Sequence, residues 1–147
     1  MRKRLPAQIA VILLLVSNAG LAQDGGYSSW NIQGLYGSSF EEPFNPEDVA
    51  KITATFENSA GWSWGSSYFF VDILNSTENE SGAWEVYAEW YPSASIGKMS
   101  GKDISAGIFK DISLTMGLNA GRKSTGASPL VFLPGTTFHF KLPGFAF

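Results

Sequence analysis

Residues 84–91 read WEVYAEWY, and this stretch decides the fold class. Four of its residues, Trp84, Val86, Ala88 and Trp90, alternate with two glutamates and two tyrosines. Successive side chains of a β-strand point to opposite faces, so strict alternation predicts a strand with one apolar and one polar face.

The same alternation recurs along the chain. Residues 50–57 read AKITATFE and residues 111–118 read DISLTMGL. Polar stretches rich in Gly, Pro, Ser and Asn separate these segments, and no segment shows a helical period. We therefore predict an all-β antiparallel meander of about six strands, with a seventh starting near Phe145. The predicted strands are residues 30–36, 50–57, 68–74, 84–91, 111–118 and 136–142.

The first residues have the layout of a secretory signal peptide. Basic residues 2–4 precede a short apolar run, IAVILLLV at 9–16, and small residues before Gln23 offer a cleavage site. The run is too short for a transmembrane helix, which needs about 20 residues, and no second long run follows. We therefore expect a signal peptide over 1–22, a mature domain over 23–147, and no helical membrane protein.

Composition narrows the class further. The chain has 16 glycines, 14% aromatic residues, only 16% charged residues and no cysteine, so a small exported domain of this kind cannot rely on disulfides. The net charge of −3 argues against a nucleic-acid partner. Such a chain must bury apolar surface, bind a partner or lie in lipid.

Alternation alone leaves two interpretations open. In a soluble sandwich the apolar face forms the core, whereas in a transmembrane β-barrel it faces lipid and the polar face lines the lumen. Export, a mixed polar face and aromatic residues near strand ends (Trp30, Tyr36, Trp84 and Trp90) favour the barrel. The alternative is a soluble periplasmic β-barrel binding protein or a small structural outer-membrane barrel.

Six strands are too few for a bacterial barrel of eight or more strands. Either the strands number eight in a tight barrel, or the chain stops partway through a larger one. Phe145–Phe147 is similar to the aromatic ending of an outer-membrane protein, but Pro143 and Gly144 interrupt the segment that would close the barrel. We favour a truncated barrel.

Residues 90–121, WYPSASIGKMSGKDISAGIFKDISLTMGLNAG, resemble the Tsx-like nucleoside-specific channel-forming proteins of the bacterial outer membrane. The resemblance extends over most of 27–147, through Trp30–Tyr36, Tyr68–Ile73 and Leu142–Gly144. It implies a twelve-stranded barrel of which this chain is about the first half. It also implies passive diffusion of nucleosides or similar small solutes, contact with outer-membrane lipid, and insertion by the barrel-assembly machinery. The family often has a second acidic residue and an arginine near the proline, where this chain has Tyr91 and Ser93.

Lumen candidates follow from strand parity. A nucleoside base needs flat rings on which to stack, and a ribose needs hydrogen-bond donors and acceptors. The alternation also puts Lys51, Glu57 and Asp111 on the face that is expected to line the lumen. Lys110 and Asp111 are adjacent, however, so they cannot both point inward. The candidate substrate-binding residues are Tyr68, Phe70, Asp72, Glu85, Tyr87, Glu89, Tyr91 and Lys110.

Catalytic chemistry is not expected. His139 is the only histidine, so neither a histidine-rich metal site nor a Ser-His-Asp set is credible. Glu85 and Glu89 lie four residues apart on one strand, about 13 Å by strand rise, which is too far for a retaining glycosidase pair. We therefore predict a protein that is not an enzyme and that binds no cofactor and no metal.

Overall fold

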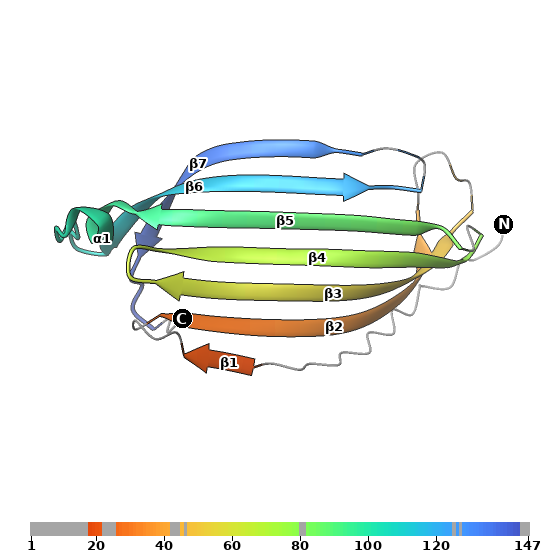
Figure 1. Ribbon diagram of the computed structural model, residues 1–147, viewed down its shortest axis with the longest axis horizontal. Coiled ribbons are helices and arrows are strands. Elements are labelled where there is room, and N and C mark those ends of the chain that lie inside the picture. Colours follow the sequence, from red (N-terminus) through yellow and green to blue (C-terminus); the bar gives the residue numbers. More distant parts are fainter. Residues whose placement is uncertain are drawn as a thin grey trace.

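The computed structural model describes residues 18–21, 26–41, 45, 47–79, 82–124, 126 and 128–144. These residues form one antiparallel sheet in which every strand pairs with its neighbours in the sequence (Figure 1). The all-β antiparallel meander is therefore confirmed, whereas the strand predicted near Phe145 lies outside the described residues. The elements are β1 (Asn18–Leu21), β2 (Tyr27–Phe40), β3 (Val49–Trp62), β4 (Gly65–Glu78), β5 (Trp84–Ser95), α1 (Ile96–Ser100), β6 (Phe109–Arg122) and β7 (Leu130–Phe140).

β5 and β7 are longer than the alternation predicts, because each has a proline within the strand instead of at its end. Pro92 stays in register opposite Ser67, and β5 continues to Ser95. Pro134 lies opposite Met116 in β7, which pairs only with β6 among the described strands. Proline lacks the backbone N–H that a ladder uses, and an edge strand tolerates this loss. The predicted end of a strand at residue 91 and the predicted start of the last strand at residue 136 were therefore wrong.

The helix α1 was not predicted, because five residues are too few to show a helical period. The hydroxyl of Ser95 caps its N-terminus by accepting a hydrogen bond from the backbone N–H of Lys98 at 3.0 Å. Gly101 ends the helix in the left-handed conformation, with φ of 65°, which glycine adopts without steric cost. The α1 segment joins β5 to β6 at one end of the sheet.

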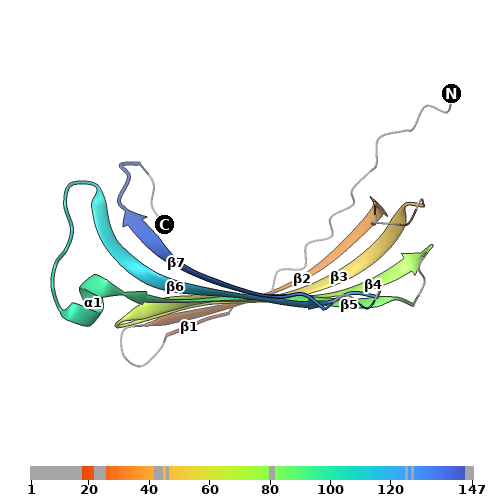
Figure 2. The ribbon, with the colours of Figure 1, turned by 90° about the horizontal axis from the view of Figure 1, so that it is seen from above.

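The pairing register preserves the alternation across the sheet. Phe70 lies opposite Glu57 on one side and Glu89 on the other, while Phe69 lies opposite Asn58 and Trp90. Most of the polar residues of the strands therefore lie on one common face and most of the large apolar residues on the other, with exceptions such as Phe70 and Asn58. Figure 2 shows that this single layer is twisted and curved.

We call the apolar-residue side of the sheet the apolar face. Its side chains are exposed: Trp84 is 63% exposed, Leu114 58%, Phe132 58% and Ile52 51%. The only buried hydrophobic residues among those described are Val49 and Ala50. The face comprises Trp30, Ile32, Tyr36, Ile52, Phe56, Phe69, Val71, Ile73, Trp84, Val86, Trp90, Leu114, Met116, Leu118, Phe132, Phe138 and Phe140.

This arrangement leaves the sheet without a conventional core. Soluble monomers rarely expose a contiguous apolar patch larger than a few hundred Å². Here the apolar face spans six strands, and no described element covers it. The fold therefore requires an apolar environment or a partner on this side.

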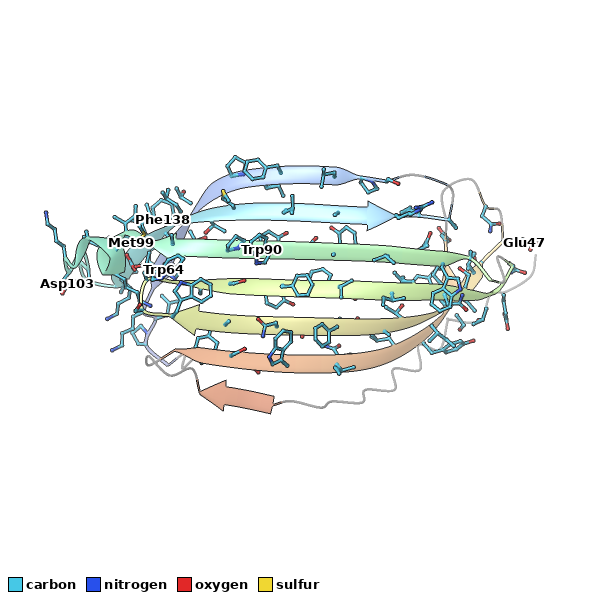
Figure 3. All side chains as sticks on the ribbon, viewed as in Figure 1. Glu47, Trp64, Trp90, Met99, Asp103 and Phe138 are labelled. Carbon is cyan, nitrogen blue, oxygen red and sulfur yellow. The ribbon has the colours of Figure 1, made fainter. Side chains whose placement is uncertain are left out.

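The two ends of the sheet differ. At the α1 end lie Trp64, Met99, Asp103 and Phe138, and Glu47 lies at the opposite end (Figure 3). A two-residue turn joins β3 to β4 at the α1 end, and the backbone N–H of Ser95 donates to the carbonyl of Trp64 at 2.9 Å there. The loops after β2, β4 and β6 are at the other end, which we call the loop end.

Candidate polar-face binding site

Seven of the eight candidate residues share one face of β4 and β5, which we call the polar face. Tyr68 lies opposite Tyr91, Phe70 opposite Glu89, and Asp72 opposite Tyr87. The register of β4 against β5 thus forms three cross-strand pairs on this face, one of two aromatic residues and two of an aromatic and an acidic residue. Glu85, opposite Leu74, is further towards the loop end.

Glu89 is the centre of a hydrogen-bonded group. The hydroxyl of Tyr87 donates to one carboxylate oxygen, and that of Tyr91 donates to the other at 2.7 Å. Asn119 of β6 donates from Nδ2 to Glu89 Oε1 at 3.2 Å and accepts from the Tyr91 hydroxyl at 3.2 Å. Four side chains from two strands therefore hold one another in fixed orientations.

A second group lies on β2, β3 and β4. Glu57 accepts from the hydroxyl of Tyr68 at 3.2 Å and from Nδ2 of Asn31 at 3.1 Å. Asp72 accepts from the hydroxyl of Thr55 at 2.5 Å. Each carboxylate is held by neutral donors, so its negative charge is not neutralised by a described basic side chain.

Aromatic rings connect the two groups. The ring centroid of Phe70 lies 6.1 Å from that of Tyr68 and 6.0 Å from that of Tyr87, both in tilted contacts. Beside these rings is a hollow of about 590 Å³. It is lined on the polar face by Gln33, Leu35, Thr53, Thr55, Glu57, Tyr68, Phe70, Asp72 and Leu74.

The arrangement suits a flat, hydroxylated solute. Aromatic faces offer stacking, and the carboxylates accept hydrogen bonds from hydroxyl or amino groups. The hollow is wide enough for a small molecule, because small-molecule sites usually measure about 300–1,000 Å³. The face therefore offers stacking surfaces and hydrogen-bond acceptors to a small molecule.

Glu85 has a structural environment different from that of the other candidates. Its carboxylate forms an ion pair with Lys51 at 2.8 Å, and the two side chains are 10% and 3% exposed. The hydroxyl of Ser124 donates to its other oxygen at 3.4 Å. Lys51 and Glu85 therefore form a buried pair and do not extend the open hollow.

The structure does not bring Lys110 to the polar-face groups. Lys110 is exposed at the α1 end, where a register shift separates Phe109 from Asp111. Asp111 instead faces the polar side, where it accepts from the Ser95 hydroxyl and from the backbone N–H of Gly97 at 3.1 Å. A carboxylate, not an ammonium group, therefore occupies this position of the polar face.

Sequence reasoning missed Asn31, Thr55 and Asn119. Thr55 has the parity of Lys51 and Glu57, but a threonine alone carries no distinctive signal. Asn119 follows the predicted strand 111–118 by one residue, so extending the alternation would have found it. Asn31 is recognisable only through its partner Glu57, and that partnership depends on the β2–β3 register.

The last features of the site concern metal binding, membrane-spanning helices and likeness to known proteins. No group of three or more potential metal ligands is present in the described part of the chain. None of its helices is long and apolar enough to cross a membrane. Comparisons with protein-family models, with curated proteins and with solved structures gave no match.

Proposed function

We propose that this chain forms part of the wall of an outer-membrane β-barrel that conducts nucleosides or similar small solutes. The observation that carries the proposal is the division of one sheet into two unlike faces. The apolar face is exposed across six strands, while the polar face carries a hydrogen-bonded set of aromatic and acidic residues. In such a barrel, lipid would cover the apolar face and the solute would pass along the polar face.

The dimensions of the strands suit this environment. A transmembrane β-strand needs about 9–11 residues, and β2, β3, β4 and β6 have 14 residues each. In lipid every backbone N–H and C=O needs a partner, so the free edge of β7 must pair with a further strand. The proposal therefore includes closure by strands beyond those described.

The polar face supports the choice of solute. Tyr68 and Phe70 line the hollow as rings on which a base can stack, and Glu57 and Asp72 line it as acceptors for ribose hydroxyls. A conducting site must also release its solute, and an open, solvent-accessible hollow favours weak binding. A Tsx-like channel fits this combination. Passive passage needs neither a cofactor nor a catalytic residue.

The test is uptake into liposomes that contain the closed barrel, which is this chain together with the strands that complete it, with adenosine compared against a sugar of equal size. We expect adenosine to enter faster, and we expect Phe70→Ala to reduce its advantage about fivefold or more, because stacking contributes about 1–3 kcal/mol per base. Phe69→Ala is the matched control, since Phe69 is the adjacent ring on the apolar face.

Three outcomes would contradict the proposal. Equal entry of adenosine and the sugar through the unaltered protein would leave only a general pore. Equal effects of the two alanine substitutions would remove the polar face from solute recognition. Recovery of the protein in the soluble periplasmic fraction, rather than as a heat-modifiable membrane protein, would favour the soluble binding barrel.

A further inference from the structure

We propose that the α1 end of the sheet binds the phosphate headgroups of an anionic lipid leaflet. The inference rests on the membrane location proposed above and adds a partner at one end. The surface, which we call the basic rim, consists of Ile96, Lys98, Met99, Lys102, Ile108 and Lys110.

Three lysines of the basic rim converge on one hollow. Lys98, Lys102 and Lys110 line a space of about 350 Å³ between α1 and the start of β6. All three are exposed, and none forms an ion pair or hydrogen bond through its ammonium group with a described residue. Asp103 and Asp111 line the same hollow, so its three lysines and two aspartates together carry a net charge of +1.

The two carboxylates beside this hollow already have partners. Asp111 accepts from the Ser95 hydroxyl and from the backbone N–H of Gly97 at 3.1 Å. Asp103 accepts from the backbone N–H of Ser105 at 2.9 Å, and hydrogen bonds from the side chain and backbone of Ser105 hold the pKa of its carboxyl below the ordinary value. These hydrogen bonds come from neutral donors and leave both acids charged, and the positive charge of Lys110 also helps to lower the pKa of the Asp103 carboxyl.

Exposed apolar side chains accompany the lysines. Met99 is 64% exposed, Ile108 55% and Ile96 38%. The backbone N–H of Lys141 donates to the carbonyl of Ile108 at 2.8 Å, which fixes this loop against the end of β7. These exposed apolar side chains therefore lie in the same segment of the chain as the lysines.

Lysine and apolar residues in one exposed surface are typical of the membrane interface. The apolar part inserts at the boundary of the acyl chains, while each lysine extends its ammonium group towards the phosphates. Trp64, which is 50% exposed at the same end of the sheet, is the kind of residue that anchors at headgroup depth. The basic rim combines all three features.

The loop end has the opposite charge balance. Its described residues include four acidic side chains and two basic ones: Glu41, Glu47, Asp48, Glu78, Arg122 and Lys123. An anionic lipid surface would therefore attract the α1 end and be less favourable for the loop end. This asymmetry assigns the phosphate partner to one end of the sheet.

The test measures partitioning of the full chain into sucrose-loaded vesicles of phosphatidylcholine, with and without 30 mol% phosphatidylglycerol (about one lipid in three). Each lysine near an anionic surface adds roughly a fivefold gain in partitioning. We expect Lys98→Gln with Lys102→Gln to lose about 25-fold of the gain that phosphatidylglycerol gives. The charge-matched control, Arg122→Gln with Lys123→Gln, should keep most of it.

The comparison between variants removes the contribution of the basic residues 2–4, which all variants share. Equal binding to both vesicle types, or equal losses in the two double variants, would overturn the proposal. Loss of the gain in 10 mM inorganic phosphate (roughly constant ionic strength) would assign the site to free phosphate instead. Failure to bind either vesicle would contradict the membrane location itself, whereas loss of the lipid preference with adenosine uptake intact would contradict only the basic rim.

Discussion

Breaking the buried ion pair on the polar face is expected to be the most destabilising single change. Lys51→Met should lower the free energy of unfolding by about 3–5 kcal/mol, because it leaves the Glu85 carboxylate buried without its cation. The two charges are 2.8 Å apart and almost fully removed from solvent. Urea unfolding of the detergent-folded protein, followed by tryptophan fluorescence, measures this change.

Two variants control this experiment. Lys51→Met combined with Glu85→Met removes both charges and should restore most of the stability, because replacing a whole buried pair by apolar residues is often neutral. Lys98→Met removes an exposed lysine and should change the stability by less than about 0.5 kcal/mol. A loss below about 1 kcal/mol in the single Lys51 variant would show that the pair is not buried in the folded protein.

The second large effect should come from placing a charge on the apolar face. Ile73→Arg is expected to destabilise the lipid-embedded protein by about 2–3 kcal/mol, because a lipid-facing arginine near the membrane centre costs about 2–4 kcal/mol. Leu74→Arg is the matched control. Leu74 is the next residue of β4, has the same side-chain class and lines the polar-face hollow opposite Glu85.

These two substitutions distinguish an apolar face covered by lipid from one exposed to water. Ile73 is 43% exposed in the structure, so in water an arginine there should cost less than about 0.5 kcal/mol. Urea unfolding of both variants in lipid vesicles compares them directly. Equal stability of Ile73→Arg and the unaltered protein would mean that lipid does not cover the apolar face.

Parity in the sequence predicted the two faces, because alternation is a local property of the chain. Residues 84–91 and 111–118 fall in strands, with their apolar residues on the common face as expected. The strand boundaries near Pro92 and Pro134 were predicted wrongly, because a proline in a sequence usually indicates a turn. Whether a proline ends a strand depends on the neighbouring strand, and that neighbour is not encoded locally.

The candidate site was predictable only in part. Parity was enough to place Tyr87, Glu89 and Tyr91 on one face. It could not identify Asn119 as the partner of Glu89, because that contact depends on the register of β5 against β6. It also could not distinguish Glu85 from Glu89, which share a parity, because the partner Lys51 lies two strands away.

Single-cysteine labelling of the protein in lipid tests most directly whether lipid covers the apolar face while the polar face meets water. The chain has no cysteine of its own, so each introduced cysteine reports on one position. Cysteines at Leu114, Met116 and Phe138 would lie on the apolar face, and cysteines at Thr115 and Thr137 on the polar face. With a water-soluble maleimide, the two polar-face positions should react and the three apolar-face positions should resist. Leu114 is 58% and Phe138 55% exposed without lipid, so rapid labelling of those positions in vesicles would contradict the account.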